Sequence, residues 1–163
     1  MTYLITFACY GRRLHGSELG SVDRKHNAPR TALVEPNASW VAAAKERMDQ
    51  TEYEMDSLRR EAVLEAIKEA CSLRGWYLLA AHIRSPHAHI VVDAEAPPER
   101  VMNDFKAYAS RRLNEMKLDE PNRKRWARHD STRWLWKPKQ VSAAIEYVVR
   151  EQGEPMAVFE SRE

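Results

Sequence analysis

Two histidines, His87 and His89, open an apolar run and are separated by one alanine, in the stretch RSPHAHIVV. Because successive side chains of a β-strand point to opposite faces, a strand here would place both imidazoles on one face. Imidazole binds divalent metal ions, but a metal site usually needs a third ligand and an open position. The pair therefore indicates either a metal or phosphate site, or two histidines on a partly exposed sheet face.

A candidate nucleophile, Tyr147, lies in the stretch AAIEYVVREQGEP. A tyrosine hydroxyl can attack a phosphodiester and form a phosphotyrosine, which keeps the bond energy for a later rejoining. Its pKa near about 10 leaves little phenolate at neutral pH, so a divalent ion on the scissile phosphate would have to assist. The alternative is a core tyrosine whose hydroxyl lies at the edge. Tyr108 is a rival nucleophile that lacks a nearby oxygen ligand.

The elements that must position these residues follow from hydrophobic periodicity. A helix is expected in DSLRREAVLEAIKEACSLRGW, with Asp56 or Ser57 as its N-cap and Gly75 as its stop. Two strands that flank Arg84 to Pro86 must form an antiparallel hairpin because their connection is so short. The remaining expectations are a strand at 3–10, a loop at 11–38, short elements at 39–48 and 51–55, a helix at 97–117, a strand at 131–136 and a helix at 139–153. The order predicts an α+β fold with helices on one face of an antiparallel sheet.

Length and composition predict one domain. The chain has 163 residues, of which 44% are hydrophobic and 31% charged, as in ordinary globular proteins. We expect a catalytic domain at 1–153 and a tail at 154–163. No apolar run is long enough for a membrane helix, so we expect a cytoplasmic protein without a membrane partner. Cys9 and Cys71 are expected to be buried thiols.

Positive charge is concentrated between residues 100 and 139, a segment that contains twelve Lys or Arg and only five Asp or Glu. Aromatic residues are interleaved with these charges, a mixture that suits a groove which follows phosphates and stacks bases. Nucleic acid is therefore the first partner to consider. The candidate contacts, including two arginines near the N-terminus, are Arg12, Arg13, Lys106, Arg111, Arg112, Arg128, Trp134 and Lys137.

Five segments in this order resemble the single-tyrosine HUH transposases and their REP-associated tyrosine transposase relatives. They are YLITFACYGRR, RGWYLLAAHIRSPHAHIVV, MNDFKAYASRRLNE, WARHDSTRWLW and AIEYVVREQGE. The resemblance covers roughly residues 3–155. It implies a ferredoxin-like or RRM-like fold, a homodimer, and Mg²⁺- or Mn²⁺-dependent cleavage of hairpin-bearing single-stranded DNA. Cleavage would leave a 5′-phosphotyrosine and a free 3′-hydroxyl.

Carried over by position, the resemblance makes His87 and His89 metal ligands and Tyr147 the nucleophile. A glutamine one turn after the nucleophile is the usual third ligand, but that position holds Glu151, and the glutamine is Gln152. On a regular helix an offset of five residues turns a side chain about 140° away. Either the helix unwinds before its end, so that Gln152 turns toward the side of Tyr147, or Glu151 binds the metal ion, since a carboxylate suits a hard cation.

Three functions remain at this point. The first is a transposase that nicks and rejoins DNA through a transient tyrosyl bond. The second is a domesticated, non-catalytic binder of structured single-stranded nucleic acid, for which His87, His89 and Tyr147 would be unnecessary. The third is a metal-dependent phosphodiesterase in which water attacks, so that Tyr147 would be dispensable.

Overall fold

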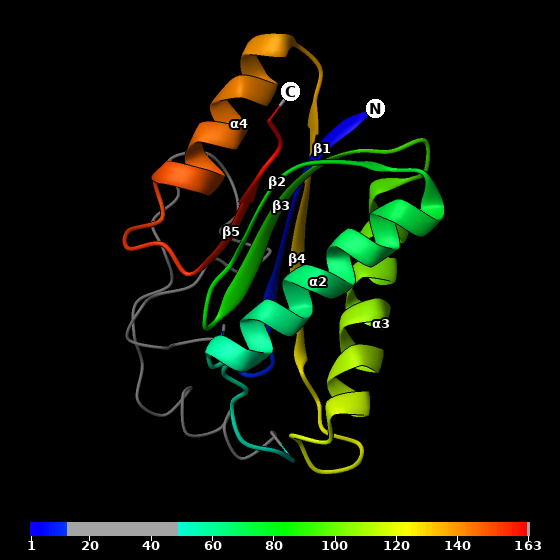
Figure 1. Ribbon diagram of the computed structural model, residues 1–163, viewed down its shortest axis with the longest axis vertical. Helices are drawn as coiled ribbons and strands as arrows, with labels where there is room; N and C mark the ends of the chain where they lie inside the picture. Colours follow the sequence, from blue (N-terminus) through cyan, green and yellow to red (C-terminus); the bar gives the residue numbers. More distant parts are fainter. Residues whose placement is uncertain (13–48, 163) are drawn as a thin grey trace, which may run out of the picture.

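The computed structural model describes residues 1–12 and 49–162, apart from the side chain of His129. In this part of the chain, five antiparallel strands form one sheet in the order β4-β1-β3-β2-β5 (Figure 1). The strands are β1 (Thr2–Cys9), β2 (Tyr77–Ile83), β3 (His87–Asp93), β4 (Trp126–Leu135) and β5 (Ala157–Glu160). The described helices are α2 (Ser57–Arg74), α3 (Pro98–Met116) and α4 (Pro138–Arg150).

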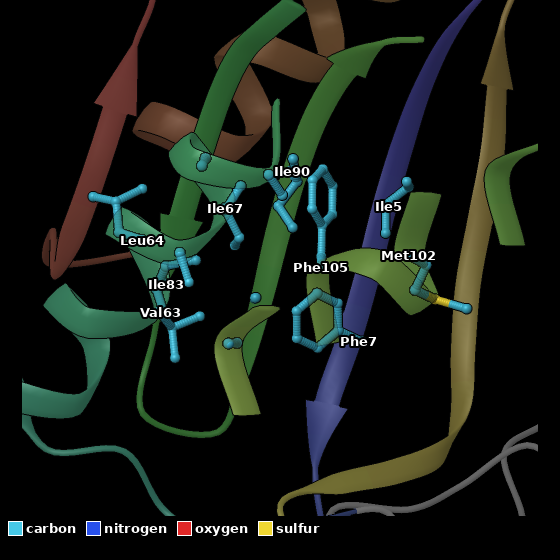
Figure 2. Packing of buried hydrophobic residues seen from close by; sticks show 14 of the residues in the cluster. Ile5, Phe7, Val63, Leu64, Ile67, Ile83, Ile90, Met102 and Phe105 are labelled. Atoms are coloured by element: carbon cyan, nitrogen blue, oxygen red, sulfur yellow. The ribbon is translucent and has the colours of Figure 1, made fainter. Parts of the chain in front are cut away.

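The main core lies between one face of the sheet and helices α2 and α3. Alternate residues of β1, including Ile5 and Phe7, point into it and are almost completely buried. Ile67 of α2 and Phe105 of α3 meet these strand residues from the other side (Figure 2). The apolar side chains repeat every two residues in the strands and about every 3.6 residues in the helices, and both sets face the same apolar layer.

The ends of α2 agree with the capping signals in the sequence. Asp56 is the N-cap, and its carboxylate accepts a hydrogen bond of 3.0 Å from the backbone N–H of Arg59. Gly75 ends the helix with a φ of 74°, a conformation that glycine adopts without steric cost. The prediction of this helix from its caps and apolar spacing is confirmed.

Helix α4 packs on the face of the sheet opposite α2 and α3. Its buried residues Ala144 and Val148 form a second, smaller core with Ala80, Val91 and Leu135 of the strands. On β3, Val91 alternates with Ile90 and Val92, which face the main core. The α+β fold with helices packed on one face of an antiparallel sheet is confirmed for α2 and α3, and α4 adds a partial cover to the other face.

The predicted C-terminal tail is wrong in one respect, because residues 157–160 form β5 and pair with β2. A short edge strand of four residues carries little local signal, since its stability comes from its partner strand. The stretch 51–55 is not a strand, although Tyr53 and Met55 are buried. The predicted loop at 11–38 lies largely outside the described residues, and Arg13 and the short helix at 39–48 lie wholly outside them.

Both cysteines are buried, as predicted. Burial raises the pKa of Cys71 to about 12 and is the largest cause of the similar rise, to about 12, in the pKa of Cys9. Neither thiol is therefore ionised at neutral pH. Among the described helices, none combines the length and the apolar composition that a membrane crossing requires.

Candidate active site

His87 and His89 lie side by side on the α4 face of β3. Their ring centroids are 4.5 Å apart, close enough for both imidazoles to reach one ion. Thr6 pairs with His89 across the sheet, and a hydrogen bond of 2.9 Å joins Thr6 Oγ1 and His89 Nδ1. Because this bond engages Nδ1, His89 would bind an ion through Nε2, the arrangement common in metal sites. The donor chemistry of the pair fits a divalent metal ion.

Helix α4 brings Tyr147 to the same place. The ring centroid of Tyr147 lies 5.7 Å from that of His89 of the same chain. The helix starts at Pro138, whose fixed φ suits a first turn. Tyr147 stands about 100° round the helix from the buried Val148. It therefore lies at the edge of the helix contact, beside the histidines, and is 41% exposed.

The rival nucleophile Tyr108 lies on α3, on the other side of the sheet. Its ring packs against the main core, and the guanidinium carbon of Arg111 lies 4.7 Å from the ring centroid. The sheet thus separates Tyr108 from the two histidines. Of these two tyrosines, Tyr147 is the one that the fold brings beside them.

The two candidates for a third ligand follow the end of α4. The helix ends at Arg150, and Glu151 has left helical geometry with a φ of −112°. The side-chain amide of Gln152 donates a hydrogen bond of 3.2 Å to the carbonyl oxygen of Tyr147. In the described part of the chain, no group of three or more His, Cys, Asp or Glu is arranged to hold a metal ion.

Two further residues, His82 and Arg84, lie beside the site. His82 pairs with His89 across the hairpin and is completely buried. Burial lowers the pKa of His82, the hydrogen bond with the Val148 carbonyl raises it, and the charge of Arg84 lowers it further. Arg84 lies next to His82, with 3.3 Å between its Nη1 atom and the His82 Nε2 atom. The available signal was the position of His82 on the strand predicted before the hairpin connection, next to the strand that carries His87 and His89. Arg84 opens that connection, and no sequence pattern singled it out.

Residues 37–148, more than half of the chain, match the family model for IS200-like transposases. The chain belongs to this transposase family. The resemblance drawn from the five sequence segments is therefore confirmed. No curated protein sequence matches this transposase at a significant level.

Two solved structures align with this chain, and the first of them supports the fold. One, a REP-associated tyrosine transposase bound to a REP hairpin, aligns with a TM-score of 0.50 and 11% identity, over 90% of this chain and 63% of that one. This chain thus spans less than two thirds of the length of that protein. Another, a proposed transposase from Deinococcus radiodurans R1, aligns with a TM-score of 0.49 and 13% identity, over 88% of this chain and 85% of that one.

Three predicted DNA contacts of this transposase lie on α3, away from the histidine pair. The Nζ atom of Lys106 is 2.8 Å from an oxygen of Asp130, and an Nη atom of Arg112 is 2.7 Å from an oxygen of Glu69. Arg111 lies over the ring of Tyr108. Acidic side chains of the protein itself thus neutralise part of the positive charge that the sequence predicted for DNA binding.

The remaining predicted contacts lie elsewhere on the surface. Trp134 stacks on Trp136, with ring centroids 5.0 Å apart and planes inclined by 10°. These rings are 39% and 66% exposed, and the exposed Lys137 follows them in the chain. Arg128 is exposed on β4, and Arg12 follows the end of β1. Trp134 pairs with Tyr3, a main-core residue, so the tryptophans lie on the opposite face from the histidines.

Proposed function

We propose that this transposase cleaves and rejoins single-stranded DNA near hairpins, with Tyr147 as the nucleophile. The observation that supports this most directly is the position of Tyr147, whose exposed ring lies 5.7 Å from His89 and beside a second imidazole. A tyrosine with only a packing role would not need to lie beside a potential metal ligand. The family match supports a DNA-processing enzyme.

In the proposed reaction, the Oη atom of Tyr147 attacks a DNA phosphorus in line with the bond to O3′. The phenol loses its proton to solvent as the new P–O bond forms. The P–O3′ bond then breaks, and O3′ takes up a proton. The products are a 5′-phosphotyrosine and a free 3′-hydroxyl, and attack by another 3′-hydroxyl reverses the steps. The covalent bond conserves the energy of the phosphodiester, so rejoining needs no ATP.

His87 and His89 would hold Mg²⁺ or Mn²⁺, with the amide oxygen of Gln152 or the carboxylate of Glu151 as the third ligand. We favour Gln152, because its side chain already contacts the backbone of the nucleophile. A bound divalent ion supplies Lewis acidity, which withdraws charge from the phosphate and stabilises developing oxyanions. Thr6 would keep His89 in the orientation that presents Nε2.

The proposed substrate is single-stranded DNA that carries a hairpin. The REP-associated relative was solved with a REP hairpin, which supports this choice. The stacked rings of Trp134 and Trp136 offer a flat surface for unpaired bases, and Arg128 and Lys137 are exposed cations for phosphates. A homodimer and a cytoplasmic location remain part of the proposal.

A covalent-trapping gel tests this function. The protein is mixed with Mn²⁺ or Mg²⁺ and labelled single-stranded DNA from the sequences that flank its own gene. We expect a metal-dependent protein–DNA adduct that Tyr147→Phe abolishes and that Tyr108→Phe, the matched control, retains. Cleavage without an adduct would instead indicate attack by water. Tight binding with neither product would identify a non-catalytic binder.

A further inference from the structure

We infer that His82 and Arg84 are positioning residues that hold the C-terminal end of α4, and with it Tyr147, against the hairpin that carries His87 and His89. The inference rests on the proposed function for its catalytic consequence. Its structural part, the attachment of α4 to the β2–β3 hairpin, stands on hydrogen bonds and burial alone.

His82 joins two segments that follow each other in the chain. Its Nδ1 atom is 3.0 Å from the carbonyl oxygen of Val148, and its Nε2 atom is 2.9 Å from the backbone nitrogen of Met156. A carbonyl oxygen only accepts and a backbone N–H only donates, so Nδ1 carries the proton and Nε2 accepts. Both ring nitrogens of this completely buried side chain are thus engaged by the backbone around the end of α4.

The Val148 carbonyl is a specific point of attachment. The last four carbonyls of a helix have no donor within the helix, and Val148 stands within the last four residues of α4, which ends at Arg150. His82 supplies the missing donor. Val148 follows Tyr147 directly, so this bond fixes the backbone next to the proposed nucleophile.

Arg84 holds the turn that follows the helix. Its Nη1 group donates a hydrogen bond of 2.8 Å to the carbonyl oxygen of Glu154 and lies 3.3 Å from the Nε2 atom of His82. Gly153 has a φ of +82°, and a Cβ there would lie 3.8 Å from the Nη2 atom of Arg84. The chain therefore reverses directly beside the guanidinium before it enters β5.

The same hairpin carries the attachment and the candidate ligands. His82 pairs with His89, and the backbone N–H of Arg84 donates to the carbonyl of His87. Paired residues of an antiparallel hairpin project to the same face, so these four side chains lie together on one face of the hairpin. The position of Tyr147 relative to the histidines is therefore set through two adjacent strands.

Few residues of α4 are fully buried against the sheet, although Val141, Ile145 and Val149 also pack there while partly exposed, so the polar bonds add to the attachment. Only Ala144 and Val148 of α4 are buried, whereas α2 alone buries seven residues in the main core. Removal of the His82 bonds should therefore loosen α4 while the main core stays folded. A displacement of about 1 Å at a reacting group can slow a reaction by about 100-fold.

The test compares His82→Ala and Arg84→Ala with two controls. Cys71→Ala removes a buried side chain from the main core, and Arg74→Ala removes an arginine that pairs with Asp104 on the other face. His82→Gln is the rescue variant, because its amide can donate to one backbone group and accept from the other. Hydrogen exchange is followed for 138–156 and for 57–74, together with Mn²⁺ affinity, hairpin affinity and the single-turnover rate of adduct formation.

For His82→Ala we expect exchange to rise at least tenfold in 138–156 and to stay unchanged in 57–74. The adduct rate should fall about 10- to 100-fold, while hairpin affinity stays within twofold, and His82→Gln should recover part of the rate. Mn²⁺ affinity should fall as well, because the favoured third ligand, Gln152, lies in the loosened segment. Arg84→Ala should show the same pattern with smaller changes, and neither control should show it.

Equal exchange increases in both regions, or no change in 138–156, would overturn the inference. An unchanged adduct rate despite loosened exchange would overturn its catalytic part. If the wild-type protein formed no adduct, the proposed function would fail, but the exchange data would still decide whether His82 and Arg84 hold α4.

Discussion

The hydrogen bond between Thr6 and His89 allows a quantitative test of the proposed metal site. Thr6→Val replaces the hydroxyl with a methyl group of similar size and keeps a β-branched residue in β1. The bond is 2.9 Å long and His89 is only 6% exposed, so solvent cannot readily replace the lost partner. Loss of such an orienting bond typically lowers metal affinity about 10- to 100-fold, or about 1.4 to 2.8 kcal/mol.

The same substitution should lower the free energy of unfolding by about 1 kcal/mol, because one buried hydrogen bond is lost. The assay is a Mn²⁺ titration followed by electron paramagnetic resonance, with urea unfolding of the metal-free protein alongside. Thr2→Val is the matched control, since Thr2 lies on the same strand, pairs with Asp93 and Leu135, and is remote from the histidines. A Mn²⁺ affinity within twofold of wild type for Thr6→Val would refute the reasoning.

Two further predictions concern stability. Burial by itself raises the pKa of Asp119, but hydrogen bonds from Tyr53, Arg59 and Arg125 outweigh it and hold the pKa below its usual value. The Asp119 and Arg125 side chains are 7% and 5% exposed, so Asp119→Asn should cost about 3 to 5 kcal/mol at pH 7 by urea unfolding. The lowered pKa means that this contribution is present above about pH 4 and is lost as pH falls through the folded-state pKa; an equal deficit at pH 7 and pH 3 would contradict it. Gly75→Ala should cost about 1 to 2 kcal/mol in the same assay, because φ is +74° and the added Cβ meets nothing within 4 Å; a much larger loss would mean that the site is crowded.

The segments with the strongest local signals were predicted well. Asp56 and Gly75 delimit α2 because a cap and a left-handed glycine act within a few residues of the helix end. The short connection after Ile83 forces a hairpin, and strand periodicity alone places His87 and His89 on one face. The family, too, could be identified from the order of its motifs.

The resemblance favoured Tyr147 over Tyr108, but periodicity did not say which of them lies beside the histidines; the tertiary structure shows that it is Tyr147. Both Tyr108 and Tyr147 lie on amphipathic helices, and periodicity says which side of a helix is apolar but not which face of the sheet it covers. The packing of α4 opposite α3 brings Tyr147 to His89 and separates Tyr108 from it. The predicted contact Lys106 is paired with Asp130, which lies 24 positions away and could not be matched by spacing.

The sequence by itself determined most of the local elements, the histidine pair and the family of this chain. Strand order, the pairing of β5 with β2 and the contacts of His82 with Val148 and Met156 depended on the tertiary structure. The physical reason is the distance along the sequence over which the interactions act. Caps, turns and side-chain periods act between residues a few positions apart, whereas sheet order and helix packing minimise exposed apolar area over the whole chain. The candidate site depends on both, because strand periodicity pairs His87 with His89 and helix packing brings Tyr147 beside them.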